Sequence, residues 1–239
     1  KPDHFLGDFY VLFSQKEKQH PELKEKAEEL LRKWEANDVS TRKLWKQMNT
    51  WAYQGFEQTY RDFKVAKFEK NYYESQWYDE GKKIILQGLK RKIFQKDNDN
   101  SIFVDLGEPL GKKVLLRQDE TSIYITQDIY LAQLKYKHYH FHKSIYVVAN
   151  EQDYHFQVLF KLLNLLNYKF AKDCYHLSYG YVLLPSGRMK SREGIIIDAD
   201  TLLENMIELS KIELSKRKNL SKIELEKRSK IIALGAIKF

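Results

Sequence analysis

Two apolar stretches joined by an amphipathic segment place the strongest limit on what this chain can fold into. Residues 145–149, Ile-Tyr-Val-Val-Ala, form a continuous apolar run, and a second run covers residues 174–184. Between them, residues 151–168 place apolar side chains at helical spacing: Phe156, Leu159, Phe160, Leu163 and Leu166. Continuously apolar strands are typical of parallel sheets, whose faces are covered by helices. With a helix predicted over 121–139, the order helix, strand, helix, strand predicts an α/β fold with a parallel sheet.

The N-terminal part of the chain is predicted to be largely helical. Pro21 opens a helix that runs to about residue 35, because proline suits the first helical position. A second helix is expected over 40–61, and the short link 36–38 between them predicts a helical hairpin. Further helices are expected over 74–90 and from residue 200 onward.

A small β unit is predicted between these helical regions. Residues 93–95, Ile-Phe-Gln, and 102–104, Ile-Phe-Val, flank the turn-forming cluster Lys-Asp-Asn-Asp-Asn at 96–100, which is typical of a β-hairpin. Residues 114–117 give a further strand. Near the C-terminus, Ser-Lys-Ile-Glu-Leu occurs at 210–214 and again at 221–225. Two copies indicate amphipathic helix turns rather than a solenoid.

Composition limits the environment and the partners of the chain. It has 41 Lys and Arg against 33 Asp and Glu, a net charge of +8, which favours a polyanionic partner or simply a basic protein with charged helix faces. Cys174 is the one cysteine, so no internal disulfide can form, and a reducing cytoplasm is expected. The sequence has no apolar run of transmembrane length, and no membrane partner is expected. Because it begins without Met and both ends are apolar, we expect a piece of a longer protein.

Tyr124 and Asp128 are the first candidate binding residues. They lie four positions apart in the predicted helix 121–139 and therefore share a face. A carboxylate can accept two hydrogen bonds from a guanidinium, and a phenol can add a hydrogen bond or a ring face, so the pair suits a cationic ligand. The alternative is an acid near a helix start that only interacts with the helix dipole.

Polar residues follow the first apolar strand. In open parallel sheets, ligands bind beyond the carboxyl ends of the strands, where helix N-termini also offer free N–H groups. Gln152 and His155 are three apart in this position and could both face a cleft. Alternatively, Asn150 or Asp153 only caps the following helix.

The segment His-Tyr-His-Phe-His at 138–142 is a candidate metal site. Three histidines at alternate positions could line one strand face, but no carboxylate or cysteine nearby completes a tetrahedral ligand set. The segment also lies where a helix should end and a strand begin. A solvated basic turn is favoured, and no metal site is predicted.

A glycine-bounded basic loop interrupts the apolar C-terminal stretches. Residues 187–194 read Gly-Arg-Met-Lys-Ser-Arg-Glu-Gly, with Arg188, Lys190 and Arg192 as cations and Ser191 as a hydroxyl. Such a loop could close on a phosphate and stabilise the charge that develops there. It could equally be a surface hairpin, and it is not a Walker loop, which needs a different glycine and lysine spacing.

Together these segments resemble class I aminoacyl-tRNA synthetases, and more narrowly the arginyl-tRNA synthetase family. The loop 188–194, Arg-Met-Lys-Ser-Arg-Glu-Gly, resembles the family's Lys-Met-Lys-Ser-Arg-Glu-Gly variant of the signature loop. Four other segments are similar to family segments, and they occur in the family's order: DHFLGDFYVLF at 3–13, YITQDI at 124–129, YVVANEQDYHF at 146–156 and HLSYGYVLL at 176–184. LGAIKF at 234–239 resembles the family's approach to its C-terminal helical domain.

The resemblance implies roles at the matching positions. Tyr124, Asp128 and Gln152 would contact the substrate arginine, with Asp128 meeting the guanidinium. ATP would be held along its adenine by Tyr179, Gly180, Tyr181 and Val182, and His155 would contact the same nucleotide. The signature loop would hold the triphosphate and act in catalysis through five residues: Arg188, Met189, Lys190, Ser191 and Arg192. ATP, with accompanying Mg²⁺, would be a substrate, and no structural metal is implied.

The resemblance also implies an architecture and a reaction. It predicts an incomplete Rossmann-like catalytic core with an inserted α+β subdomain and C-terminal helices. The expected segments are 1–19 (core), 20–117 (helical hairpin and small β subdomain), 118–209 (catalytic core) and 210–239 (helical connection). The implied enzyme is a monomeric arginine–tRNA ligase, in which ATP activates L-arginine to arginyl-adenylate for transfer to the 3′ end of tRNA(Arg).

One family motif is missing from the sequence. His-x-Gly-His, which lies upstream of these segments in the family, does not occur among the 7 histidines, so the chain alone is expected to be inactive. The alternative is a non-catalytic basic module of synthetase-like fold that binds RNA or nucleotide, through phosphate contacts and stacking on the 16 tyrosines.

Overall fold

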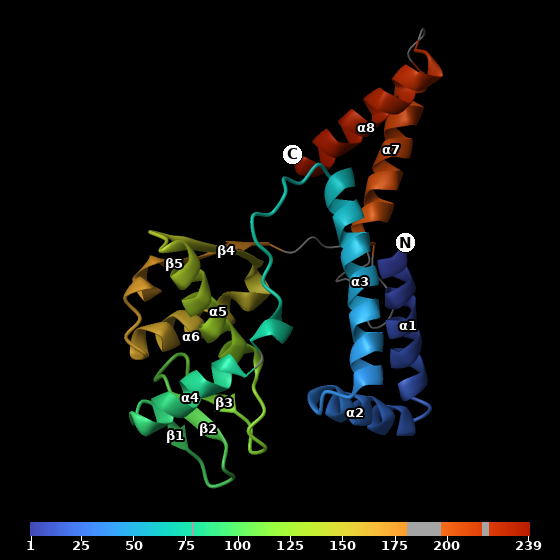
Figure 1. Ribbon diagram of the computed structural model, residues 1–239. Helices are drawn as coiled ribbons and strands as arrows, with labels where there is room; N and C mark the ends of the chain where they lie inside the picture. Colours follow the sequence, from blue (N-terminus) through green and yellow to red (C-terminus); the bar gives the residue numbers. More distant parts are fainter. Residues whose placement is uncertain (78, 181–196, 217–219) are drawn as a thin grey trace. The chain divides into compact units, whose positions relative to one another are not determined.

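The computed structural model describes residues 1–77, 79–180, 197–216 and 220–239 (Figure 1). The chain forms two compact units: unit 1 comprises residues 1–68 and 183–239, and unit 2 comprises residues 69–182. These units divide the chain at other places than the four segments expected from the sequence, and the four-segment division stays a prediction. A search of the described helices finds none with the length and apolar character needed to span a lipid bilayer.

Unit 2 contains the predicted parallel sheet. Strands β4 (Ser144–Ala149) and β5 (Cys174–Tyr179) pair in parallel, from Ser144 beside Cys174 to Ala149 beside Tyr179. Helix α5 (Tyr124–Tyr139) precedes β4, and helix α6 (Asp153–Leu165) connects β4 to β5. The helix, strand, helix, strand prediction is therefore confirmed. The described part of β5 ends at Tyr179, and residues 181–184 of the predicted strand lie outside the described residues.

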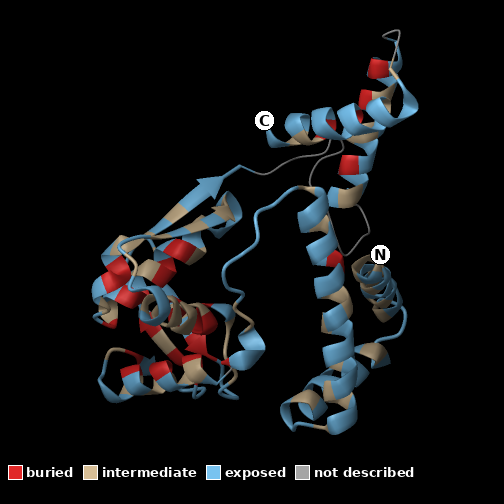
Figure 2. Cartoon of the chain, turned by 45° about the horizontal axis from the view of Figure 1, so that its top comes forward, coloured by how far each residue is buried: buried red, intermediate tan, exposed pale blue. Residues whose placement is uncertain are grey.

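The two faces of this sheet differ in burial. Tyr146 and Val148 of β4 pack against the core that α5 and α6 form with Ile129, Leu159 and other fully buried side chains (Figure 2). The alternate residues Ile145 and Val147 are 54% and 63% exposed, and Tyr175 and Leu177 of β5 share this exposed state. The prediction that 145–149 is wholly buried is therefore wrong, because successive side chains of a strand point to opposite faces and only one face meets the core of unit 2.

A second sheet joins the same core. Strands β1 (Gln95–Lys96), β2 (Ile102–Asp105) and β3 (Lys112–Leu116) form an antiparallel sheet in that order, which confirms the predicted hairpin and the strand after it. Leu115 and Leu116 of β3 are completely buried beside helix α4 (Glu80–Lys90) and α5. The small β unit is thus one side of the unit 2 core.

The predicted helix 74–90 is interrupted. Its first residues form a short 3₁₀ turn, η1 (Glu74–Gln76), and the α-helix begins only at Glu80. The break falls at Trp77, whose φ of −145° and ψ of 26° are not helical and whose side chain is only 6% exposed. The expected helix is therefore broken where the Trp77 indole is buried.

Unit 1 is helical in its described part. It contains α1 (Pro2–Glu17), α2 (Glu22–Glu35), α3 (Val39–Asp62), α7 (Ala199–Ser215) and α8 (Lys222–Lys238). The predicted hairpin of α2 and α3 differs from the structure, because α3 runs alongside α1 while α2 crosses at their ends (Figure 1). Helix α2 buries no residue, and its apolar side chains Leu30, Leu31 and Trp34 meet only the first turns of α3. Helices α7 and α8 pack together through Ser210, Leu214, Ser229 and Ala233.

Asp38, in the turn between α2 and α3, has a lowered pKa that can be tested by substitution. The Asp38 carboxylate accepts hydrogen bonds from the Thr41 N–H (2.8 Å) and the Ser40 hydroxyl (2.7 Å), which lower the pKa of Asp38 to about 2. A carboxyl with a lowered pKa stabilises the fold above its ordinary pKa, and this contribution is lost as the pH falls towards 2. We expect Ser40→Ala to raise the pKa of Asp38 in an NMR titration. Ser14→Ala in α1 is the control and should leave the titration unchanged.

Candidate functional site

The carboxyl ends of β4 and β5 meet at one edge of the parallel sheet in unit 2. Ala149 lies beside Tyr179, and the chain continues from β4 through the 3₁₀ turn η2 (Asn150–Gln152) into α6. Asp153, the first residue of α6, accepts a 2.7 Å hydrogen bond from the Ser178 hydroxyl of β5. His176 donates through Nε2 to the Val148 carbonyl at 2.9 Å, and its Nδ1 lies 3.4 Å from Asp153 Oδ1. These contacts fix the start of α6 to the ends of both strands.

A carboxylate and an imidazole meet between the starts of the two helices. Asp128 lies in the second turn of α5 and His155 in the first turn of α6, and Nε2 of His155 is 2.7 Å from Oδ2 of Asp128. The Asp128 side chain is 36% exposed and that of His155 is 23% exposed. The structure therefore joins two residues that the sequence assigned to different substrates, and it leaves the carboxylate accessible.

Lys135 adds a cation near this pair and was not predicted. It lies seven residues after Asp128 on α5, and its Nζ is 4.5 Å above the ring of Tyr146 in β4. Burial lowers the pKa of Lys135, and the charge of Asp128 acts in the opposite direction. Burial also raises the pKa of Tyr146 well above its usual value. A spacing of seven residues, about two helical turns, places Lys135 on the same side of α5 as Asp128. This spacing could have identified Lys135 from the sequence.

The other predicted arginine contacts are exposed. Tyr124, the first residue of α5, is 80% exposed and lies one turn before Asp128. Gln152 ends the turn η2 at the carboxyl edge of the sheet, and its side chain is also exposed. Tyr124, Asp128 and Gln152 are thus on elements that begin or end near this edge, but among the described residues the direct contact is between Asp128 and His155.

Only some of the predicted ATP-binding residues belong to the part of the chain that the structure describes. Tyr179 ends β5 at the same edge and is 53% exposed, and Gly180 follows it. Tyr181 and Val182 lie outside the described residues. So does the whole signature loop, with its five predicted catalytic residues Arg188, Met189, Lys190, Ser191 and Arg192.

The histidine segment 138–142 does not form a strand. His138 lies in the last turn of α5 and stacks on Tyr72, with ring centroids 5.7 Å apart. Its Nδ1 is 2.9 Å from Lys70 Nζ and 2.9 Å from the Tyr72 hydroxyl. His140 ends the helix in a left-handed conformation, with a φ of 45°. The helical backbone thus removes the alternation on which a three-histidine face would depend.

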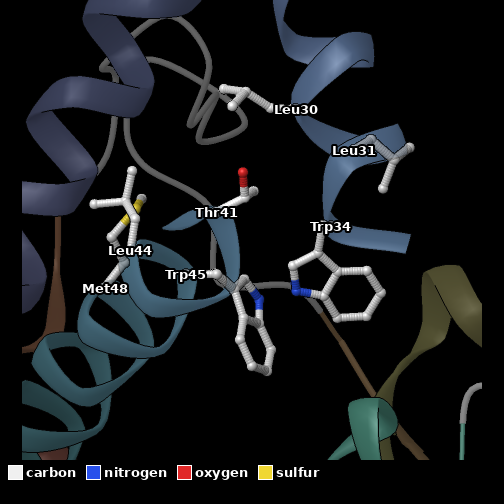
Figure 3. A pocket seen from close by; sticks show the side chains of 7 residues that line it. All are labelled: Leu30, Leu31, Trp34, Thr41, Leu44, Trp45 and Met48. Atoms are coloured by element: carbon white, nitrogen blue, oxygen red, sulfur yellow. The ribbon is translucent and has the colours of Figure 1, made fainter. Parts of the chain in front are cut away.

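Unit 1 has pockets of a different character. One, of ≈ 380 Å³, is lined by seven residues (Figure 3): Leu30, Leu31, Trp34, Thr41, Leu44, Trp45 and Met48. The guanidinium of Arg42 lies 3.6 Å above the Trp34 ring and its Nε donates to the Trp34 carbonyl at 2.8 Å. The lining is almost entirely apolar, so it offers little for a phosphate or a charged amino acid.

A second unit 1 pocket is acidic. Its volume is ≈ 680 Å³, and Asp3, His4 and Asp200 bring three potential ligand atoms within 4.8 Å of one another there. The Lys1 ammonium contacts Asp200, which also accepts hydrogen bonds from His4 and Thr59 at 3.0 Å. The Asp200 carboxylate therefore already has a cation and two further partners, whereas Asp128 has one described hydrogen-bond partner, His155, and remains accessible.

The fold agrees with comparison to known proteins. Residues 2–239 match the family model described as tRNA synthetases class I (R), catalytic domain. The chain belongs to this family. Its two-stranded parallel sheet, with α5, α6 and the site at the carboxyl edge, is accordingly part of a class I synthetase catalytic domain.

Two relatives of this chain are both named arginine–tRNA ligase. The chain is 46% identical over 268 aligned residues to an arginine–tRNA ligase of Phocaeicola vulgatus and 47% identical over 261 to one of Parabacteroides distasonis. All of this chain is covered in both comparisons, and it spans 44% and 43% of the length of these relatives. The chain thus corresponds to less than half of each relative.

Solved structures share the fold of the domain. The arginyl-tRNA synthetase of Plasmodium falciparum matches with a TM-score of 0.71 at 21% identity, over 92% of this chain and 37% of that one. The arginyl-tRNA synthetase of Thermus thermophilus matches with a TM-score of 0.59 at 16% identity, over 96% of this chain and 48% of that one. These likenesses confirm the predicted α/β synthetase fold.

Proposed function

We propose that the protein containing this chain is an arginine–tRNA ligase. In the first step, a carboxylate oxygen of L-arginine attacks the α-phosphorus of ATP, which forms arginyl-adenylate and releases pyrophosphate. In the second, a ribose hydroxyl at the 3′ end of tRNA(Arg) attacks the activated carbonyl, which forms the ester and releases AMP. The observation that carries the proposal is the accessible Asp128 carboxylate between the starts of α5 and α6, in a chain whose relatives carry this name.

The arginine subsite is proposed to be built on α5 and η2. Asp128 accepts hydrogen bonds from the guanidinium, which presents a planar fork of donors matched to a carboxylate. Tyr124 lies one turn away, where its hydroxyl or ring can meet the same group. Gln152, at the end of η2, offers an amide for the polar end of the amino acid. Because Asp128 is partly withdrawn from water, its attraction for a cation exceeds that of a fully solvated acid.

The ATP subsite is proposed to lie beyond β5. Tyr179 and Gly180 continue the sheet edge, and with Tyr181 and Val182 they would contact the adenine. The cations of residues 188–192 would meet the phosphates together with Mg²⁺ that accompanies ATP. Catalysis then consists mainly of holding the two substrates in line and stabilising charge on the phosphates.

The activity is tested by the amino-acid dependence of pyrophosphate exchange. The intact protein, with ATP, Mg²⁺ and tRNA, should exchange radiolabelled pyrophosphate into ATP with L-arginine and not with L-lysine or L-citrulline. Citrulline is the sharpest control, because it has nearly the shape of arginine without its charge. Binding of tRNA or ATP without any arginine-dependent exchange would instead support the non-catalytic module.

A further inference from the structure

We propose that His155 is a positioning residue for the arginine subsite: its Nε2–H holds Oδ2 of Asp128, so that the other oxygen is presented to the guanidinium. This rests on the proposed function. The resemblance assigned His155 to ATP, whereas its described hydrogen bond is to the carboxylate of the proposed amino-acid subsite.

The chemistry of the contact determines the direction of the hydrogen bond. An ionised carboxylate can only accept, so the imidazole must donate through Nε2. The separation of 2.7 Å is short for an N–H···O bond and suits a charged acceptor. Within the described chain Oδ1 of Asp128 receives no hydrogen bond, so this oxygen is available to a ligand.

His155 is held by surroundings that are themselves fixed. Its ring packs edge-on against Phe156, with centroids 5.6 Å apart and an interplanar angle of 86°. Phe156 is 8% exposed, and its ring lies 4.2 Å from that of His176 in β5. Asp153, two residues before His155, is hydrogen-bonded to Ser178. The donor therefore sits on a helix start that is fastened to the sheet, as an orienting residue requires.

Lys135 supplies the reason for orienting the carboxylate. Its charge interacts with Asp128 from two turns along α5, in a partly buried site where such interactions are strong. The hydrogen bond from His155 fixes one oxygen of Asp128, so the carboxylate keeps one orientation beside this second charge.

Two variants of His155 test the role in pyrophosphate exchange by the intact protein. His155→Phe keeps a ring but removes the donor, and should raise the KM for arginine about tenfold, the loss of one charge-assisted hydrogen bond. The KM for ATP should stay unchanged. His155→Gln places an amide N–H near the position of Nε2 and should restore most of the arginine KM. Tyr154→Phe removes a neighbouring hydrogen bond, to the Leu110 carbonyl, and should alter neither constant.

Each outcome is decisive. A rise in the KM for ATP alone would overturn the proposal in favour of the nucleotide role. An arginine KM that is unchanged in His155→Phe would also overturn it. So would an equal rise in the arginine KM of the Phe and Gln variants, which would show that packing matters and the hydrogen-bond donor does not. If thermal melting shows that His155→Phe does not fold, His155→Asn replaces it, because its shorter side chain cannot reach Oδ2. Absence of arginine-dependent exchange in the unmodified protein would refute the proposed function itself, before any variant is made.

Discussion

Asp128→Asn should lower kcat/KM for arginine in pyrophosphate exchange by about a hundredfold or more, the usual cost of removing one partner from a desolvated charge pair. The amide keeps the size of the side chain but removes the charge and one acceptor, and its N–H₂ group would face the N–H donors of the guanidinium. The KM for ATP should change little, because the expected nucleotide contacts lie on β5 and beyond it.

Glu108→Gln is the matched control for this loss of charge. Glu108 is an exposed carboxylate of unit 2, in the loop between β2 and β3. Its neutralisation changes the net charge equally and should leave both Michaelis constants as they were. Wild-type arginine kinetics in Asp128→Asn, or equal losses in the two variants, would exclude Asp128 from the guanidinium site.

Gly81→Ala should reduce the free energy of unfolding of unit 2 by about 2 kcal/mol, the typical cost of overpacking a core. A Cβ at Gly81 in α4 would lie 2.4 Å from the backbone oxygen of Thr126 in α5. Thr126 is completely buried and its hydroxyl donates to the Leu115 carbonyl of β3, so the helix cannot easily yield. Urea denaturation followed by the fluorescence of Trp77 measures the effect, since the other three tryptophans lie in unit 1.

Gly7→Ala, in helix α1, should increase the free energy of unfolding instead of lowering it. A Cβ at Gly7 in α1 meets no atom within 4 Å, so alanine should stabilise unit 1 by about 0.5–1 kcal/mol through its better helix propensity. Equal changes in the free energy of unfolding on replacing the two glycines by alanine would show that the contact between α4 and α5 is not as close as described.

Gly81→Ala should also affect the arginine subsite. Because Thr126 lies two residues before Asp128, a displaced α5 should raise the KM for arginine in this variant.

Local patterns in the sequence predicted most elements of the fold. The apolar strands, the helix between them and the turn at 96–100 each depend on nearby residues, and the structure has them. The exposure of Ile145 and Val147 was not predictable in this way, because burial of a strand face depends on which elements cover it. The course of α3 beside α1 likewise depends on contacts between distant segments.

The candidate site shows the same division. Tyr124 and Asp128 were found from helical spacing, and Gln152 from its place after a strand. The pairing of Asp128 with His155 joins residues 27 positions apart on two helices, and no spacing rule connects them. His155 and Asp128 were therefore each recognised as site residues, while the contact between them was not predicted. The role of the signature loop stays a prediction, since that loop lies outside the described residues.

A crystal structure of the intact protein with L-arginine and a non-hydrolysable ATP analogue would show which groups bind the guanidinium. We expect the guanidinium within hydrogen-bond distance, about 2.7–3.1 Å, of Oδ1 of Asp128, with His155 still on Oδ2. Arginine bound elsewhere, for example beside Asp198 and Asp200 in the acidic pocket of unit 1, with Asp128 free of ligand, would contradict it.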